Sequence, residues 1–460
     1  MARWRIEPAE RPLRGAVFVP GDKSIAHRAW MLAPLASGVS RIRGVPTGDD
    51  VRRSREAMLQ LGAVAHETEP GAWTIEGRGL RGLRAPTRGI DCGSSGTTLR
   101  LLAGLLSWQH FDSRLDAGAQ LARRPMARIT RPLRNRGARI DGVFDAAQND
   151  EHAPLDIHGI PEGVRLNPAD VTLEIASAQL KGALLLSGLA ALGPTLVSEP
   201  VVTRDHTERM FDVMGAPLRT AGTAVALDPT DWDGKLRPLD FTVPGDLSSA
   251  TFLLVAAHIV RGSRIVVKGV GTNRTRSGAL DVLREMGGGA SIEDKGESGG
   301  EPVGDLHIGA NGIVELRRAA RVAGELSVRA IDEVPALVAA AVYAPGASEF
   351  RDVRELRVKE SDRIAALAAM LSAFGVQHEV HDDGLTVDGG RGAAGGHAVA
   401  ANRVIDPHGD HRIAMAAAIV ALGARGPTVI GGVECVDKSF PGFEDALRRL
   451  GATIVREEDN

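Results

Sequence analysis

Apolar and polar residues alternate along this chain in a pattern that recurs about every 75 residues. Segments with helical periodicity, such as residues 365–371 (Ala-Ala-Leu-Ala-Ala-Met-Leu), end at a single glycine, and a short strand pattern follows. A glycine at this place fits the left-handed C-cap of a helix. The recurring glycines are Gly62, Gly137, Gly215, Gly287, Gly375 and Gly451, which are 72 to 88 residues apart.

This recurrence predicts six repeated units, because self-similarity at a fixed period indicates repeated supersecondary structure. Each unit reads as strand, helix, strand, helix and further strand. The period exceeds the roughly 20–50 residues of common solenoid repeats. We therefore expect the units to be grouped into compact domains, and a solenoid remains the alternative.

One short element occurs twice with the same scaffold and different charge. Residues 20–24 read Pro-Gly-Asp-Lys-Ser, and residues 244–248 read Pro-Gly-Asp-Leu-Ser. Each copy leads into an apolar helix pattern, a glycine and a strand pattern. In the second copy, Lys23, His27 and Arg28 become Leu247, Thr251 and Phe252. Packing needs would be shared by both copies, so the charge difference points to chemistry in the first.

Composition narrows the class of protein. At 460 residues the chain should form two or more domains. A net charge of −3 argues against broad nucleic-acid binding, and 3% aromatic residues are too few for a base-stacking surface. Cys92 and Cys435 give no disulfide framework, and no run of about 18 apolar residues indicates a membrane span. Neither is there an apolar signal core at the start, so the cytosol is the expected location.

Two polar stretches inform the domain boundaries. Residues 228–240 are rich in Pro, Asp and Gly and predict a loop just before the second Pro-Gly-Asp copy. Three units precede this loop and three follow it. Residues 293–304 are rich in Gly and acidic residues, and we expect an exposed loop there within the second half.

The first candidate site is the start of the helix predicted after Asp22. A helix N-terminus that carries Lys23, Ser24 and Arg28 is suited to an anion, because free backbone amides add to the side-chain donors. It is not the Walker pattern, since no Gly-x-x-x-x-Gly precedes the lysine. An ordinary capped helix with exposed cations is the alternative.

Further clusters also lie at predicted helix starts. Residues 93–98 (Gly-Ser-Ser-Gly-Thr-Thr) would let a ligand approach the backbone, although a plain turn and cap would look the same. Residues 123–126 form a short basic stretch, which is usually a solvated face. Of the seven lysines, four lie in such clusters, namely Lys23, Lys181, Lys359 and Lys438.

The densest charge cluster is residues 359–363, Lys-Glu-Ser-Asp-Arg. We expect Lys359 and Arg363 to share one helix face with Glu360 beside them, where a carboxylate could transfer a proton. A local salt-bridge network is the alternative. Residues 410–412 (Asp-His-Arg), with Asp406 and His408, superficially offer metal ligands, but no Cys/His framework accompanies them and no metal is predicted.

Taken in order, these motifs resemble those of the 5-enolpyruvylshikimate-3-phosphate synthase family over essentially the whole chain. Any one motif is modest evidence, whereas their order and spacing together are highly specific. The matching segments are 20–24 with Arg28, 96–98 with Arg100, 124–126, 177–179, 204–208, 331–333, 357–363, 410–412 and 439–441.

The resemblance implies a fold of the α/β (α+β) class. It is a two-domain inside-out α/β barrel of the β-prism type, with six βαβαββ repeats, three in each domain. The N-terminal domain would be residues 21–242. Residues 1–20 would join residues 243–460 in the C-terminal domain.

The resemblance also implies a reaction and its partners. The 5-hydroxyl of shikimate 3-phosphate would attack C2 of phosphoenolpyruvate as C3 gains a proton, and the tetrahedral intermediate would expel phosphate. No metal or organic cofactor would be needed. The enzyme would be a cytoplasmic monomer without nucleic-acid or membrane partners, and glyphosate would inhibit it.

Residue roles follow from the same resemblance. Proton transfer would fall to Asp332, Glu360 and Lys23. Shikimate 3-phosphate would be bound by Lys23, Ser24, Arg28, Ser177, Ala178, Gln179, Arg204, Asp332 and Lys359. Phosphoenolpyruvate would be bound by Lys23, Gly96, Arg124, Gln179, Arg363, Arg412 and Lys438.

Two positions depart from the family pattern. Ser94 stands where the family usually has Asn, and Glu355 stands where some members have a substrate-binding Asn. Both put individual substrate contacts in doubt.

Other proteins remain alternatives. The UDP-N-acetylglucosamine enolpyruvyl transferases share fold and chemistry, but the lid cysteine common in that family is missing from residues 112–128. RNA 3′-phosphate cyclase uses related repeats with ATP and RNA. A non-catalytic scaffold is a further alternative, against which the intact Lys23, Asp332 and Glu360 argue.

Overall fold

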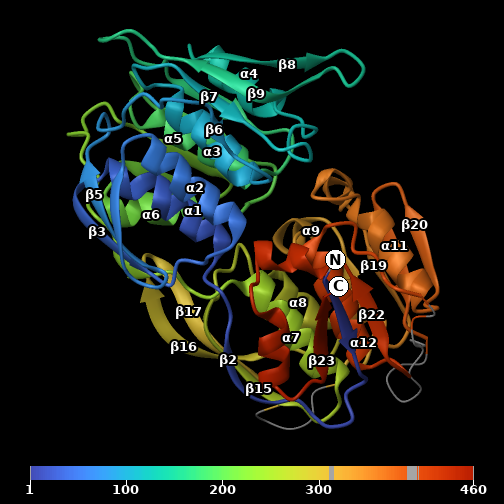
Figure 1. Ribbon diagram of the computed structural model, residues 1–460. Helices are drawn as coiled ribbons and strands as arrows, with labels where there is room; N and C mark the ends of the chain where they lie inside the picture. Colours follow the sequence, from blue (N-terminus) through green and yellow to red (C-terminus); the bar gives the residue numbers. More distant parts are fainter. Residues whose placement is uncertain (1, 310–314, 391–400, 402, 459–460) are drawn as a thin grey trace. The chain divides into compact units, whose positions relative to one another are not determined.

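The computed structural model describes residues 2–309, 315–390, 401 and 403–458. Contacts between residues divide the chain into two compact units. Unit 1 comprises residues 1–20, 244–296 and 302–460, and unit 2 comprises residues 21–243 with the short segment 297–301. Each unit holds three of the six sheets (Figure 1).

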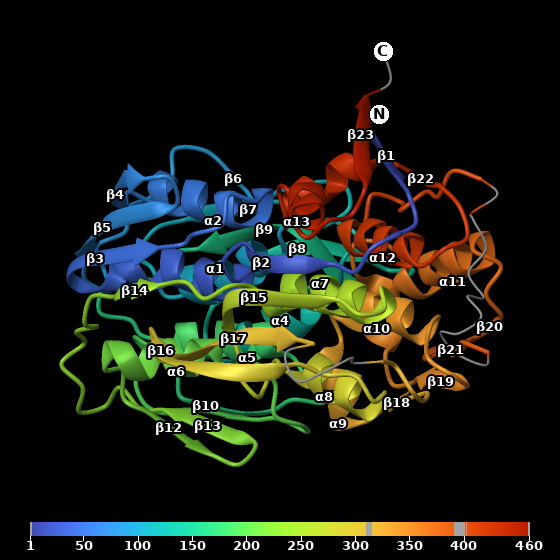
Figure 2. The same ribbon diagram turned by 90° about the horizontal axis from the view of Figure 1, so that it is seen from below.

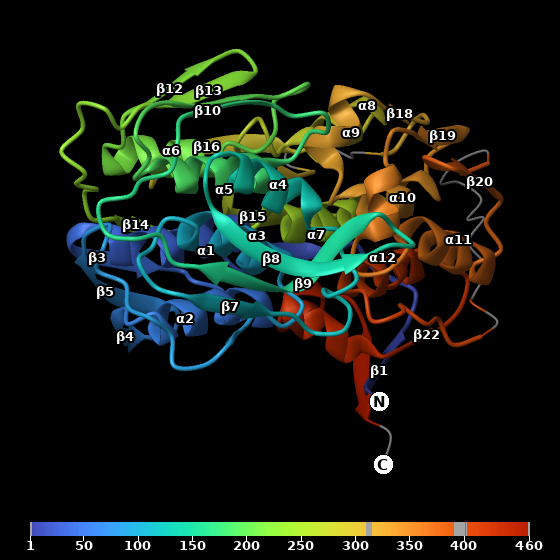
Figure 3. The same ribbon diagram turned by 90° about the horizontal axis from the view of Figure 1, so that it is seen from above.

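The three sheets of unit 2 share one strand scheme, in which a parallel pair at one edge is followed by antiparallel strands. Their strand orders are β14-β3-β5-β4, β6-β7-β9-β8 and β10-β11-β13-β12. The bounds are β3 Ser37–Arg43, β4 Val64–Glu69, β5 Ala72–Arg78, β6 Ile90–Asp91, β7 Ser113–Asp116, β8 Arg139–Asp145, β9 Asp150–His158, β10 Ala169–Thr172, β11 Thr195–Ser198, β12 Leu218–Ala221, β13 Ala224–Leu227 and β14 Asp240–Thr242. Figure 3 shows β10, β12 and β13 side by side.

Two sheets of unit 1 repeat the scheme, with the orders β16-β17-β15-β2 and β18-β19-β21-β20. Their bounds are β2 Arg14–Phe18, β15 Arg264–Gly271, β16 Ser291–Ser298, β17 Glu301–Ile308, β18 Arg321–Val322, β19 Ala347–Phe350, β20 His378–His381 and β21 Gly384–Asp388. Figure 2 shows β2 beside β15, with which it pairs in parallel.

The remaining sheet of unit 1 is completed by the N-terminus. Strand β1 (Ala2–Ile6) lies between β22 (Thr428–Gly431) and β23 (Ile454–Glu458) and pairs antiparallel with both. A parallel bridge from Ile405 to Ile430 takes the place of the missing edge strand. The first strand of the chain therefore fills a position in the last repeat.

Buried helices form the centre of each unit. In unit 2 they are α1 (Lys23–Leu32), α3 (Gly96–Leu106) and α5 (Ala178–Gly188). In unit 1 they are α7 (Leu247–Ile259), α10 (Val334–Ala341) and α12 (His411–Leu422), and every residue of these three is buried. A helix that is apolar all round belongs in a core. The sheets stay separate around these helices, so the predicted inside-out two-domain α/β fold is confirmed.

A second set of helices precedes the third strand of each repeat. They are α2 Asp49–Gln60, α4 Ala127–Asn135, α6 His206–Met214, α8 Gly278–Glu285, α11 Arg363–Ala373 and α13 Phe443–Arg449. All six recurring glycines follow these helices and have positive φ, between +69° and +103°. The predicted glycine C-caps are confirmed, because a residue without Cβ adopts this backbone region at no steric cost. The other helical segments are α9 Glu325–Ala330, η1 Ala33–Leu35, η2 Arg354–Val358 and η3 Val433–Lys438.

The central helices of unit 2 approach one another very closely at one glycine. A Cβ on Gly104 of α3 would lie 2.2 Å from the carbonyl oxygen of Ala183 in α5. Only glycine allows this approach, which brings the starts of α3 and α5 within reach of shared side-chain contacts.

The prediction of an exposed loop over residues 293–304 is wrong. These residues lie in the hairpin formed by β16 and β17. All but the last residue of β16 is exposed, so its sequence carries no apolar alternation and backbone pairing alone identifies it as a strand. Among the described residues, no helix has both the length and the apolar character needed to cross a membrane.

Candidate active site

The start of α1 in unit 2 carries a lysine held by a carboxylate. Asp22 caps the helix and accepts hydrogen bonds from the amides of Ser24 and Ile25 at 2.7 and 3.1 Å. The Lys23 ammonium donates to Asp50 Oδ2 at 2.8 Å. Ser24 lies beside it, partly exposed at the same helix end. This arrangement places an ammonium group at a helix N-terminus, where the helix dipole favours an anion.

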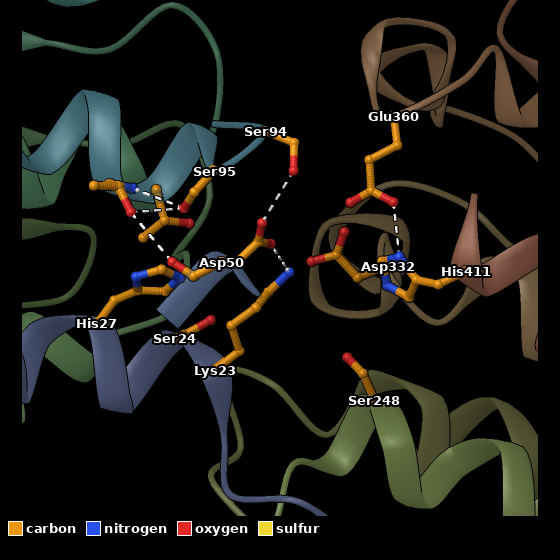
Figure 4. Close-up of polar contacts among 12 residues, drawn as sticks. Lys23, Ser24, His27, Asp50, Ser94, Ser95, Ser248, Asp332, Glu360 and His411 are labelled. Atoms are coloured by element: carbon orange, nitrogen blue, oxygen red, sulfur yellow. Dashed lines mark hydrogen bonds and ion pairs between the residues drawn. The ribbon is translucent and has the colours of Figure 1, made fainter. Parts of the chain in front are cut away.

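Beneath this surface runs a chain of buried polar groups (Figure 4). His27 Nδ1 lies 2.7 Å from Ser54 Oγ, which lies 2.9 Å from Thr98 Oγ1, and Thr98 Oγ1 donates to Ser95 Oγ at 2.7 Å. Burial lowers the pKa of His27 to about 3, so the imidazole is neutral near pH 7. The chain links the start of α1 to α2 and α3.

The starts of α3 and α5 are joined by the Gln179 amide. Gln179 Nε2 donates to Thr97 Oγ1 at 3.0 Å, and its oxygen accepts from Arg100 at 2.6 Å. Ser177 caps α5 by accepting from the Leu180 amide at 3.3 Å, and Ala178 is the first helical residue. The predicted residues 177–179 therefore all lie at one helix start.

Two cations meet beside these helix starts. Arg28 is buried, and it donates to Thr207 Oγ1 at 2.7 Å and to the Ser24 carbonyl at 2.9 Å. Burial lowers the pKa of Arg28 to about 10, whereas Glu208 and Asp22 raise it and the like charge of Arg204 lowers it. A buried guanidinium at a helix start is suited to an anion such as phosphate.

Gly96 and Arg124 face each other in the same unit. A Cβ on Gly96 would lie 3.2 Å from a guanidinium nitrogen of Arg124 and 3.6 Å from a methyl carbon of Leu121. Gly96 is the first residue of α3, and Ser95 caps the helix through the Thr98 amide. The helix start and the arginine thus share one small space.

In unit 1 the central cation is Arg363, whose side chain is 2% exposed. It donates from Nε to Asp410 Oδ2 at 2.8 Å and lies 3.6 Å from Asp332 Oδ1. Burial alone would lower its pKa, but Asp410, Glu360 and Asp332 outweigh that effect and raise the pKa of Arg363. Asp410 also caps α12 through the Arg412 amide at 3.0 Å.

The Glu360 carboxylate lies between an arginine and a histidine. Its Oε2 is 3.3 Å from Arg363 and 2.8 Å from His411 Nδ1, as Figure 4 shows for the histidine. Lys359 Nζ is 3.6 Å from Asp332 Oδ1. A carboxylate that contacts an arginine and a histidine can hold or transfer a proton.

The prediction that Lys359 and Arg363 share a helix face is wrong. Helix α11 begins only at Arg363, and Asp362 caps it through the Ala365 amide at 3.0 Å. Lys359 and Glu360 precede the helix, after the short η2 segment. The capping aspartate breaks the helical continuity that the charge spacing suggested. Asp332 nevertheless lies near both cations.

The second Pro-Gly-Asp copy is filled by buried side chains of unit 1. Arg276 donates to Asp246 Oδ1 at 2.8 Å and to Ser248 Oγ at 3.0 Å, and Ser248 donates to the fully buried Glu333. The helix start that meets solvent in the first copy here meets a protein carboxylate. Arg276 already supplies the cation, and Leu247 is fully buried, where a second, unpaired ammonium would be costly.

The remaining predicted residues of unit 1 lie at two places. Arg412 donates to the backbone oxygen of Asp332, which ties α12 to the start of α10. Lys438 ends η3 and lines a hollow with Cys435 and Glu434. Burial raises the pKa of the Cys435 thiol to about 12. The η3 segment packs against α12, the helix that Asp410 caps.

Lys181 has a different role from the other clustered lysines. It is 3% exposed and pairs with Glu199 at 2.6 Å and Glu208 at 2.7 Å. Burial alone would lower its pKa, but the two carboxylates raise it. We assign it to the packing of unit 2.

The sequence motifs missed several contributing residues. Asp50 belongs to none of them. Together with Asp49 it forms an acidic pair in the first turn of a helix, which is common in helices and does not by itself indicate a site. His411 belongs to the 410–412 motif, but the sequence predicts no contact with Glu360 for it, and Arg276 belongs to no motif. Ligand atoms of Glu360, Asp410 and His411 lie within 4.8 Å of one another, a spacing that suits a cation. Arg363 already supplies positive charge to two of them.

Comparison with known proteins gives one consistent result. Residues 8–447 match the family model of EPSP synthase (3-phosphoshikimate 1-carboxyvinyltransferase). The chain is 46% identical over 451 residues to the 3-phosphoshikimate 1-carboxyvinyltransferase of Halorhodospira halophila, which covers 98% of this chain and 96% of that protein. It is 45% identical over 444 residues to the same enzyme of Acidiphilium cryptum, with 96% of each chain covered.

Solved structures agree. The EPSP synthase of Acinetobacter baumannii superposes with a TM-score of 0.85 at 37% identity, covering 100% of both chains. The enolpyruvyl transferase NikO from Streptomyces tendae superposes with a TM-score of 0.73 at 19% identity over 99% of both chains, which shows a shared fold.

Proposed function

Since this chain belongs to the EPSP synthase family and catalyses enolpyruvyl transfer in the shikimate pathway, we propose that residues of both units bind the anionic substrates and transfer protons. Unit 2 supplies Lys23 and the polar groups at its helix starts. Unit 1 supplies further cations and the two carboxylates that move protons. The observation that supports this division most strongly is the Glu360–Arg363–Asp332 cluster, which places two carboxylates on one buried guanidinium.

Shikimate 3-phosphate is bound by polar groups at the starts of α1 and α5, with help from unit 1. In unit 2 the contacts come from Lys23, Ser24, Arg28, Ser177, Ala178, Gln179 and Arg204. Asp332 and Lys359 supply the contacts in unit 1. Arg28 is a buried cation in the first turns of α1, and a guanidinium there supports a phosphate group at that place.

Phosphoenolpyruvate is bound by Lys23, Gly96, Arg124, Gln179, Arg363, Arg412 and Lys438. The small space that Gly96 leaves beside the guanidinium of Arg124 supports a small anion at the start of α3. Fixed cations offset the repulsion between the two anionic substrates and stabilise the charge that develops as the intermediate forms.

Proton transfer involves Glu360, Asp332 and Lys23. Glu360 contacts His411 and Arg363, so its carboxylate is oriented before substrate arrives. As the 5-hydroxyl of shikimate 3-phosphate adds to C2 of phosphoenolpyruvate, one protein group takes the hydroxyl proton and another delivers a proton to C3. A base then removes a proton from C3 as the C2–O bond to phosphate breaks, which restores the double bond.

The setting of the enzyme is part of the same proposal. We assign residues 21–242 and residues 1–20 plus 243–460 to the two enolpyruvyl transferase domains. We expect a cytoplasmic monomer without nucleic-acid or membrane partners. Both cysteines are buried without a disulfide, which suits a reducing compartment.

The proposed phosphoenolpyruvate contacts predict how glyphosate acts on this enzyme. Gly96→Ala should raise the inhibition constant of glyphosate about tenfold or more while raising the KM of phosphoenolpyruvate much less. The added methyl group lies 3.2 Å from Arg124 and displaces its guanidinium, which crowds the longer ligand first. Steady-state inhibition on both proteins measures the two constants.

A purely structural role for Gly96 gives a different result. Gly96 has no left-handed backbone, so alanine fits the start of α3 without strain. The thermal midpoint should therefore stay unchanged. Equal fold-changes in both constants would remove Gly96 from the binding site.

A further inference from the structure

Asp50 occupies a position between three helix starts that no substrate-binding motif explains. It is the second residue of α2 and is 9% exposed. Its Oδ2 accepts from the Lys23 ammonium at 2.8 Å, and its Oδ1 lies at the limit of a hydrogen bond, 3.5 Å, from Ser94 Oγ. Figure 4 shows all three side chains pointing toward one another.

The backbone of Asp50 contacts a network of buried hydrogen bonds. Its carbonyl oxygen lies 3.5 Å from Thr98 Oγ1, and Ser54, one turn later in α2, bonds to both Thr98 and His27. These groups are fully buried, and buried hydrogen-bond networks of this kind fix their members in one arrangement. The carboxylate is therefore placed by the packing of α1, α2 and α3 and does not depend on a bound substrate.

The Asp50 carboxylate fixes the position of the Lys23 ammonium group. The Lys23 side chain is 22% exposed, and a lysine without a fixed partner can adopt many rotamers. It also stands in the first turn of α1, where the positive end of the helix dipole disfavours a cation. A fixed carboxylate offsets that repulsion and holds the ammonium in one direction before any anion binds.

We propose that Asp50 is a positioning residue that acts through Lys23 and sets the location of its ammonium for phosphoenolpyruvate. This inference rests on the role of Lys23 in the proposed function. A direct part for Asp50 is disfavoured, because a carboxylate placed against two anionic substrates would repel both. Ser94 belongs to the same arrangement, since its hydroxyl faces Asp50 Oδ1 while the Lys23 ammonium donates to Oδ2.

A double-mutant cycle tests the inference on the full-length enzyme. Asp50→Asn keeps the size and removes the charge, and it should lower kcat/KM for phosphoenolpyruvate about tenfold. In the Lys23→Met background the same change should lower it less than about twofold, because no ammonium remains to be positioned. The thermal midpoint of each variant shows that it folds.

Asp49→Asn is the matched control. Asp49 precedes Asp50 in α2, but its carboxylate lies against Arg52 and Arg53. This variant should keep kcat/KM within about twofold, as expected for a surface ion pair.

The outcomes distinguish the positioning role of Asp50 from the proposed function of Lys23. A large loss in Lys23→Met with an equal further loss on adding Asp50→Asn would overturn the positioning role while leaving the proposed function of Lys23 intact. A Lys23→Met enzyme with normal kcat/KM would overturn both. Coupling between the two sites supports the inference.

Discussion

Glu360→Gln should lower kcat by about 10²–10⁴-fold, the usual contribution of general acid–base catalysis. Glutamine keeps the size of the side chain and can still lie near Arg363 and His411, but it cannot carry the proton. The KM of shikimate 3-phosphate should change by less than about threefold, since the proposed contacts to that substrate remain. Steady-state kinetics with both substrates varied gives the two values.

Glu379→Gln provides the matched control in the same unit. Glu379 lies on β20 with its side chain 75% exposed, and it takes no part in the Arg363 cluster. Its replacement should leave kcat unchanged. If kcat of the Glu360 variant stayed within a factor of about three, Glu360 would have no role in proton transfer.

Arg363→Met should produce the largest loss of stability, about 3–5 kcal/mol in the free energy of unfolding of unit 1. Arg363 is 2% exposed, and its removal leaves the fully buried carboxylate of Asp410 without its cation. Breaking one side of a buried ion pair costs far more than the pair contributes, because the remaining charge stays desolvated. Urea unfolding measures the change.

Two further variants show whether the uncompensated charge is the cause. Adding Asp410→Asn to Arg363→Met should recover part of the lost stability, since the buried charge is then gone. Arg321→Met removes an arginine that is 75% exposed and pairs with Glu349 at 3.5 Å, and it should change stability little. A loss below about 1 kcal/mol in Arg363→Met would show that Asp410 is not paired as described.

Much of the fold could be predicted because the end of each helical pattern, a glycine and the start of a strand pattern occur together in the sequence. Each recurring glycine ends a helix and precedes a strand, and all six have the backbone that only glycine adopts freely. The Asp-capped starts of α1 and α7 are visible as one repeated motif. Strand β16 could not be predicted in this way, because it has no buried face to mark it.

The candidate site was predicted where its residues stand at helix starts. Lys23, Gly96, residues 177–179 and Arg412 all lie where the capping pattern placed them. Contacts between helix starts that lie far apart in the sequence could not be deduced. Asp50 meets Lys23 across 27 positions, and Arg363 meets Asp410 across 47.

Assignment to function depends on one measurement above all. Purified enzyme supplied with phosphoenolpyruvate should release inorganic phosphate when shikimate 3-phosphate is added, with one enolpyruvyl product formed per phosphate. UDP-N-acetylglucosamine in place of shikimate 3-phosphate should give no release above background. Phosphate release with the sugar nucleotide alone, or none with shikimate 3-phosphate, would contradict the account.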